Sequence, residues 1–271
     1  MKTDKRTFAF VVAALAAPLL SAAAQTTTSQ PPPTLTQIPL ASPGVASSVA
    51  SEETGMPEAL AFDGTHVWVA RQFTHSVTKL NATNGAIAGT FPVGNRPLAL
   101  AFDGTHVWVA NFGSDTVQRL QTSDGSVVAT VPVPGGPGSL AFGGGALWVA
   151  SRGGNSVTKI QPSTGAVLGT FPVGRRPMGM AVAGTNVWVA NNLDDTVTKL
   201  RASDGVALGT YPVGKGPMGV AFDGIRVWVT NFFSDTVTKI QAGTGAVLAT
   251  YPVGDSPAGV VYDGQRIRVA N

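Results

Sequence analysis

Short apolar runs alternate with turn signals along the chain, and the alternation recurs with a fixed period. The segment AFDGTHVWVA fills residues 61–70 and returns unchanged at 101–110, a spacing of 40 residues. Related segments keep this spacing, at 141–150, 181–190, 221–230 and 261–270. All five tryptophans hold one position of the segment, as Trp68, Trp108, Trp148, Trp188 and Trp228. A fixed period of this length is typical of repeat proteins.

Within one repeat the apolar period is two, which predicts strands and not helices. In the unit 97–136 we expect four strands, at 98–102, 107–110, 116–120 and 126–133. Asp103-Gly104 separates the first two and favours a tight hairpin. Four short antiparallel strands in each repeat are typical of a propeller blade. The sequence therefore predicts an all-β chain that forms a single β-propeller of four-stranded antiparallel blades.

The recurring tryptophan is predicted to be structural. In a strand, Trp108 points to the face opposite Val107 and Val109, and packing against neighbouring blades would bury both faces. We expect Trp108→Ala to cost about 3–5 kcal/mol of folding free energy.

Five units are complete: 57–96, 97–136, 137–176, 177–216 and 217–256. A sixth unit runs only through its second strand, to Asn271. The segment 35–38 matches 77–80, so 35–50 could supply the outer strands of that blade and hide its edges. This interpretation predicts six blades. The alternative is a truncated seven-bladed ring, and Arg268, at the tryptophan position, fits either.

The first 24 residues have the pattern of a secretory signal peptide. A basic start precedes the apolar stretch 8–20, and three alanines offer a cleavage site before Gln25. An uncleaved anchor is the alternative. We interpret 25–34 as a proline-rich linker and 35–271 as the propeller. The protein is therefore expected to be exported, to the periplasm, the cell surface or the medium, with no transmembrane segment after cleavage.

Net charge bears on the class of partner, and cysteine content bears on what stabilises the fold. Residues 1–24 take three basic residues and one acidic residue from totals of 18 and 15, which leaves 15 and 14. A net charge near +1 gives no reason to expect nucleic acid as a partner. The chain has no cysteine, so disulfides do not stabilise it. We expect a monomer.

The repeat resembles known bacterial propellers. The pattern PVG-x-x-P, then L-A-F-D-G-x-x-V-W-V-A-N and T-V-T-K-L, is similar to YVTN-type and YncE-like repeats over 57–271. It also resembles the virginiamycin B lyase (streptogramin lyase) family and, more loosely, NHL repeats. The lyase resemblance implies histidine and glutamate with a divalent metal at the channel mouth, acting on a lactone. Here, however, histidine occurs only at 66, 75 and 106, and glutamate only at 52, 53 and 58.

Other chemistry is not indicated by the sequence. The recurrent Asp-Gly pairs have a conformational explanation, and His66 and His106 merely flank such turns. There is no cysteine, no histidine pair at ligand spacing and no calcium loop, so we expect neither a metal nor a cofactor.

The loops between blades and those between second and third strands are predicted to lie on one rim. Their sequences vary from unit to unit while the strands stay similar, which is typical of a scaffold that presents a binding surface. Their basic side chains favour an anionic ligand. The candidate ligand-binding residues are Arg71, Arg96, Asn111, Phe112, Arg152, Arg175, Arg176, Asn191, Lys215, Asn231 and Phe232. An ordinary mixed surface is the alternative, because aspartates occupy neighbouring loops.

We therefore expect a non-catalytic propeller that binds an anionic small molecule, a glycan or a protein through this rim. The alternative is a divergent enzyme on the same fold, a carbon–oxygen lyase resembling virginiamycin B lyase.

Overall fold

A computed structural model describes residues 35–37 and 57–271 of the chain. The signal peptide and linker predicted at 1–34 lie outside the described residues, as do residues 38–56. The predicted outer strands at 35–50 are therefore described only at 35–37.

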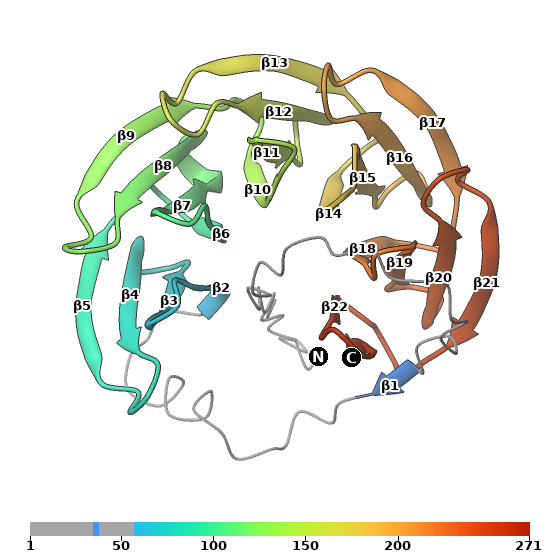
Figure 1. Cartoon of the computed structure of the whole chain (residues 1–271), viewed down its shortest axis with the longest axis horizontal. Helices are drawn as coiled ribbons and strands as arrows, with labels where there is room; N and C mark the ends of the chain where they lie inside the picture. The colour runs from blue at the N-terminus through green and yellow to red at the C-terminus, as the bar shows by residue number, and fades with distance from the viewer. Residues whose placement is uncertain (1–34, 38–56) are drawn as a thin grey trace, which may run out of the picture.

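Five four-stranded antiparallel sheets stand side by side around a common axis (Figure 1). The first contains β2 (Pro57–Phe62), β3 (His66–Arg71), β4 (Ser76–Asn81) and β5 (Ile87–Pro92). The second contains β6 (Pro97–Phe102), β7 (His106–Asn111), β8 (Thr116–Gln121) and β9 (Val127–Pro132). The short 3₁₀ helix η2 (Phe112–Ser114) joins β7 to β8.

The next three sheets keep the same order of strands from the axis outward. The third contains β10 (Pro137–Gly143), β11 (Ala146–Ser151), β12 (Ser156–Ile160) and β13 (Val167–Pro172). The fourth contains β14 (Pro177–Ala183), β15 (Asn186–Asn191), β16 (Thr196–Arg201) and β17 (Ala207–Pro212). The fifth contains β18 (Pro217–Phe222), β19 (Arg226–Asn231), β20 (Thr236–Gln241) and β21 (Val247–Pro252). The predicted all-β chain of four-stranded antiparallel sheets is confirmed.

A sixth sheet combines both ends of the described chain. It is ordered β1 (Leu35–Gln37), β23 (Ile267–Ala270), β22 (Gly259–Tyr262). The first segment thus lies beside the last strand, as its match to 77–80 suggested. However, β1 runs parallel to β23, whereas the third strand of every other sheet is antiparallel to the second. In those sheets a tight turn forces the reversal, and no such turn joins β23 to β1.

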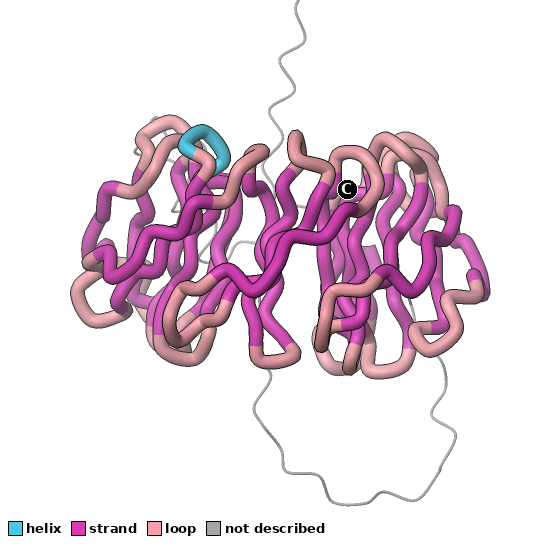
Figure 2. Tube along the Cα trace, turned by 90° about the horizontal axis from the view of Figure 1, so that it is seen from above, coloured by secondary structure: helices cyan, strands magenta, loops and turns pink. Residues whose placement is uncertain are grey.

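The sheets end in two rims, seen at the top and bottom of Figure 2. The upper rim carries η2, the turns between second and third strands and the connections from sheet to sheet. The lower rim carries the turns between first and second strands and between third and fourth strands. The described residues include no helix long and apolar enough to cross a membrane.

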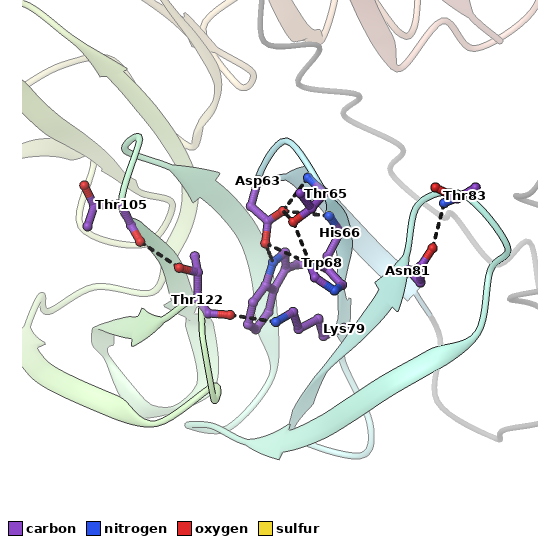
Figure 3. A network of polar contacts seen from close by, with 9 residues as sticks. All are labelled: Asp63, Thr65, His66, Trp68, Lys79, Asn81, Thr83, Thr105 and Thr122. Atoms are coloured by element: carbon purple, nitrogen blue, oxygen red, sulfur yellow. Dashed lines mark hydrogen bonds and ion pairs between the residues drawn. The ribbon is translucent and has the colours of Figure 1, made fainter.

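An aspartate fastens the first turn of the lower rim to the core (Figure 3). Asp63 accepts hydrogen bonds from the backbone N–H groups of Thr65 and His66, at 2.8 and 2.6 Å. Its other oxygen accepts from Trp68 Nε1 at 2.8 Å. The carboxylate thus fixes the turn and satisfies a buried indole.

The same bond recurs where the aspartate recurs and changes where it is absent. It joins Asp103 to Trp108 at 2.7 Å and Asp223 to Trp228 at 2.9 Å. In the sixth sheet Arg268 takes the place of tryptophan and donates to Asp263. In the third and fourth sheets a glycine and an alanine, Gly143 and Ala183, hold the aspartate position.

Each core lies between two neighbouring sheets. The tryptophan of one sheet packs against valine and leucine of the next, for instance Trp68 with Val107, Val109 and Leu120. All five tryptophans are buried, as the sequence predicted.

A cation also ties each of the first four sheets to the next one. The Lys79 ammonium lies 5.3 Å from the centre of the Trp68 ring and donates to the Thr122 carbonyl at 2.7 Å. Equivalent bonds run from Arg119 to Pro162, Lys159 to Ala202 and Lys199 to Gly243. Each crosses to the outer turn of the following sheet.

Candidate anion-binding site

A cavity of about 500 Å³ opens at the upper rim. Its walls come from the first four sheets and the connections between them. The polar residues that line it are Glu58, Gln72, Arg96, Arg152, Asn155, Arg175 and Arg176. Five of the eleven rim candidates therefore line one cavity: Phe112 and four of the five candidate arginines, Arg96, Arg152, Arg175 and Arg176.

Arg96 and Arg176 occupy strained backbone positions. Their φ angles are 53° and 52°, in the left-handed region; the equivalent residues of the next connection are the glycines Gly136 and Gly216, and that of the last connection is Ser256, with φ 54°. A residue with a side chain is disfavoured there by about 1–2 kcal/mol. Strain of this kind gathers at functional sites.

The backbone of both arginines is held by the preceding sheet. The Arg96 N–H donates to His75 Nδ1 at 3.1 Å, and the Arg176 N–H donates to Asn155 Oδ1 at 2.9 Å. These bonds give the two connections a fixed position. His75 therefore serves as an acceptor in the framework of the rim.

Arg152 reaches the cavity because a glycine makes room for it. A Cβ atom on Gly138 would lie 2.4 Å from Arg152 Nε. The equivalent residues of the neighbouring sheets are larger, Leu98 and Met178. Burial lowers the pKa of Arg152 to about 10; the Glu58 carboxylate opposes this shift, and Arg176 and Arg96 add to it. Arg152 stays protonated at neutral pH, within a group of like charges.

Glu58 lines the cavity but was not among the residues that the sequence pointed to. It begins the innermost strand of the first sheet, is buried, and lines the cavity. Burial raises its pKa, while Arg152 and Arg96 act in the opposite direction. The available signal was a lone glutamate at a position that is apolar in units such as the second, where it is Leu98.

Gln72 links this glutamate to an arginine. With its amide nitrogen turned toward Glu58, it donates to Glu58 Oε1 at 2.9 Å and its oxygen accepts from Arg96 at 3.1 Å. The hydrogen-bonding groups decide this orientation of the amide. Gln72 thus links Glu58, an acceptor on the first sheet, to Arg96, a donor on the connection between the first and second sheets.

Phe112 supplies an aromatic surface between two of the cations. The guanidinium carbons of Arg96 and Arg152 lie 5.1 and 6.0 Å from the centre of its ring. Cations over a ring face are attracted to it. Phe112 therefore helps to position both guanidinium groups.

Arg175 is partly neutralised by a neighbour. Its Nε donates to Asp194 Oδ1 at 2.6 Å, and its guanidinium also donates to the Leu193 carbonyl at 2.9 Å. The backbone N–H and the side chain of Arg175 lower the pKa of Asp194. An exposed pair of this kind contributes little to stability.

Three of the predicted ligand-binding residues make hydrogen bonds within the framework of the sheets. Asn111, Asn191 and Asn231 are fully buried. Their side-chain amides donate to polar groups of the adjacent third strand, including Gln118, Thr198 and Thr238. These contacts give the three asparagines a place in the framework beneath the rim, and their assignment to the binding surface stays a prediction. Arg71 holds the equivalent position, is buried, and donates to Thr78 Oγ1 at 2.8 Å.

The remaining two candidates lie on the rim outside the cavity lining. Lys215 is exposed on the connection to the fifth sheet. The ring of Phe232 contacts that of Phe233 edge-on, with 5.1 Å between the centres.

The described residues contain no evident set of side-chain ligands for a metal ion. No group of three or more histidine, cysteine, aspartate or glutamate side chains there could hold an ion. His66 and His106 lie at lower-rim turns, within 3.6 and 3.7 Å of Asp63 and Asp103. The expectation of a site without metal or cofactor stays a prediction.

No protein-family model matches the chain, and no curated protein sequence matches it. Solved structures do. A catalytically inactive variant of virginiamycin B lyase from Staphylococcus aureus, with quinupristin, is 17% identical with a TM-score of 0.71, covering 80% of this chain and 78% of that one. A streptogramin B lyase structure is also 17% identical with a TM-score of 0.71, covering 82% and 78%.

A more distant match comes from hydrazine synthase of Kuenenia stuttgartiensis. It is 14% identical with a TM-score of 0.58, and covers 77% of this chain and 90% of that one. At such identities the likeness concerns the fold alone. The predicted resemblance to the lyase propellers is thereby confirmed at that level: the chain has a β-propeller fold related to that of virginiamycin B lyase.

Proposed function

We propose that the protein binds an anionic ligand in the cavity of the upper rim. The observation that carries the proposal is the convergence of Arg96, Arg152, Arg175 and Arg176 on one cavity. Guanidinium groups bind carboxylates and phosphates through paired hydrogen bonds. The volume of about 500 Å³ falls within the range of small-molecule sites.

The charge of the cavity favours this ligand class. Arg152 is partly desolvated and lies near Arg96 and Arg176, which lower its pKa. A bound anion would relieve the repulsion among these cations and repay part of their desolvation. Two of the arginines also occupy backbone positions that suit glycine better, a conformation that Ser256 shares at the equivalent position.

The double variant Arg96→Gly/Arg176→Gly tests the proposal. Glycine suits the left-handed backbone at both positions, so the fold should persist while two charges are lost. We expect isothermal titration with citrate to show saturable binding to the wild type and at least about tenfold weaker binding to the variant, about 1.4 kcal/mol. Lys215→Ala is the matched control, since it removes an upper-rim charge outside the cavity lining. Equal weakening by both changes would contradict a specific site.

Gly138→Ala tests the same site without removing a charge. The added methyl group would displace the Arg152 guanidinium. Binding of citrate should weaken although every arginine is still present. Unchanged affinity would show that Arg152 does not contact the ligand.

Catalysis is a second candidate, favoured by two observations. The fold is related to that of virginiamycin B lyase, and the cavity holds a glutamate whose pKa is raised by burial, as general acids and bases require. Incubation with quinupristin, with and without a divalent metal, followed by mass spectrometry, decides between the two. Conversion by the wild type that Glu58→Gln abolishes would establish an enzyme.

The proposal includes export of a six-bladed ring. The sixth blade would comprise β22, β23 and β1, and the signal peptide at 1–24 would be cleaved before Gln25. N-terminal sequencing of the protein recovered from the periplasm or the medium tests the cleavage. Retention of the full chain in the cytoplasm would contradict it.

A further inference from the structure

The acidic side chain of the cavity carries an inference about its ligand, and this inference rests on the proposed anion binding. In the described part of the chain, Glu58 is the one acidic residue that lines the cavity. A site built only to attract negative charge has no use for a buried carboxyl group among its arginines. The equivalent residue of the second unit is an apolar leucine, Leu98, so the fold does not require an acid here.

Glu58 also accepts fewer hydrogen bonds from the described residues than a carboxylate can. Gln72 donates to one of its oxygens, Oε1. The hydrogen bonds of the described residues include no donor to the other oxygen. A carboxylate accepts about four hydrogen bonds, so acceptor capacity remains beside the arginines.

We propose that Glu58 makes the cavity selective for anions that carry a hydroxyl or ammonium donor next to the negative group. Hydroxy acids, amino acids and acidic sugars belong to this class. Their anionic group would pair with the arginines, and their donor would bind the Glu58 carboxylate. An anion without the donor would place its charge near Glu58 and leave the second oxygen of that carboxylate without a donor, which disfavours binding in a buried site.

The electrostatics around Glu58 agree with this role. Burial raises the pKa of Glu58, and Arg152 and Arg96 oppose the rise. When the carboxyl group takes up a proton at lower pH, it becomes a donor and ceases to repel a plain anion. Selectivity should therefore decrease as the pH falls.

A competing explanation is that Glu58 only holds Arg96 and Arg152 in place. In that case its loss would weaken the binding of all anions alike. The two explanations therefore differ in a ratio of affinities and not in one affinity.

Citrate and tricarballylate form a matched pair, because they differ only in the central hydroxyl group. Titration calorimetry at pH 7.5 with the full chain should give at least about tenfold tighter binding of citrate to the wild type. In Glu58→Gln the ratio should fall below about threefold, with tricarballylate bound as tightly as before or more tightly. Glu58→Leu, which restores the residue of the second unit, should give the same result if the glutamine variant folds poorly.

The outcomes separate this inference from the function on which it rests. Equal affinities in the wild type, or a ratio that survives both substitutions, would overturn the role of Glu58 and leave anion binding intact. A parallel loss of both ligands in Glu58→Gln would assign Glu58 to positioning the arginines. Failure of both ligands to bind the wild type would overturn the proposed function, and the inference with it.

Discussion

The two rims of the propeller are built from the same repeat, but the residues of the repeat recur more regularly at the lower rim than at the upper rim. At the lower rim an aspartate makes the same three bonds in the first, second and fifth sheets, two to the turn and one to tryptophan. At the upper rim arginine replaces glycine at 96 and 176, and glutamate replaces an apolar residue at 58. These three residues, which differ from their equivalents in other units, line one cavity. A repeat with five similar copies can thus specialise at one rim while the other holds the sheets together.

The largest expected effect belongs to the core beneath the lower rim. Trp108 is fully buried and bonded to Asp103. Trp108→Ala should destabilise the protein by about 3–5 kcal/mol, because it leaves a cavity and removes the hydrogen bond to Asp103 Oδ2. Urea unfolding followed by circular dichroism measures the loss. A change below about 1 kcal/mol would mean that the lower rim does not hold the fold.

Next comes the aspartate of the lower turn. Burial raises the pKa of Asp63, but hydrogen bonds from Trp68, Thr65 and His66 outweigh burial and hold that pKa below its ordinary value of 3.8. Asp63→Ala should cost about 2 kcal/mol at neutral pH, since four hydrogen bonds to a charged group disappear.

This contribution has a definite dependence on pH. Because the folded pKa is the lower one, the stabilisation by Asp63 is complete above the ordinary value and disappears as the pH falls through the folded value. Thermal melting of wild type and Asp63→Ala should therefore converge as the pH drops below about 4. The control is Asp255→Ala, on the exposed upper rim. A constant difference between wild type and Asp63→Ala across this range would contradict the assignment.

A smaller effect of opposite sign is expected in the fourth sheet. Trp188 Nε1 is buried without a hydrogen-bond partner among the described residues, and Ala183 stands where other units have aspartate. Ala183→Asp should supply the acceptor and stabilise the protein by about 1 kcal/mol. Chemical denaturation compares it with Ala183→Asn, which lacks the charge. Destabilisation by both would show that the Gly184-Thr185 turn cannot place the new side chain.

The smallest effect on stability is expected at the upper rim. Arg96→Gly relieves a left-handed backbone position but adds freedom to the unfolded chain, and these terms nearly cancel. The free energy of unfolding should change by less than about 1 kcal/mol, while anion binding weakens. A large loss of stability would mean that Arg96 supports the fold, and the contrast between the rims would fail.

Much of the fold could be predicted from the sequence because its determinants are local. Period-two alternation, Asp-Gly turns and one tryptophan per unit identify strands and their order without any distant contact. The direction of β1 was predicted wrongly, because the match to 77–80 implies a strand antiparallel to its neighbour, whereas β1 runs parallel to β23 and no turn joins the two.

The site was predictable only in outline. Basic residues in variable loops pointed to Arg96, Arg152, Arg175 and Arg176 as rim candidates, and these four line one cavity, while their role in binding stays a prediction. The buried asparagines such as Asn111 follow equally variable strand ends, and sequence alone does not tell whether such a side chain points into the sheet. The room that Gly138 leaves for Arg152, and the approach of Glu58 to both, depend on packing across three sheets.

The cation that each of the first four sheets extends to the next has a consequence for how this protein can be rearranged. Lys79 completes the outer turn of the second unit, and Lys199 completes that of the fifth. The residues that stabilise each other through this bond therefore belong to two successive repeats: the cation lies in one unit and its acceptor in the next. Because each acceptor is a backbone carbonyl, the outer turn of another unit can accept the same cation, so exchange of one whole 40-residue unit for another should preserve these bonds.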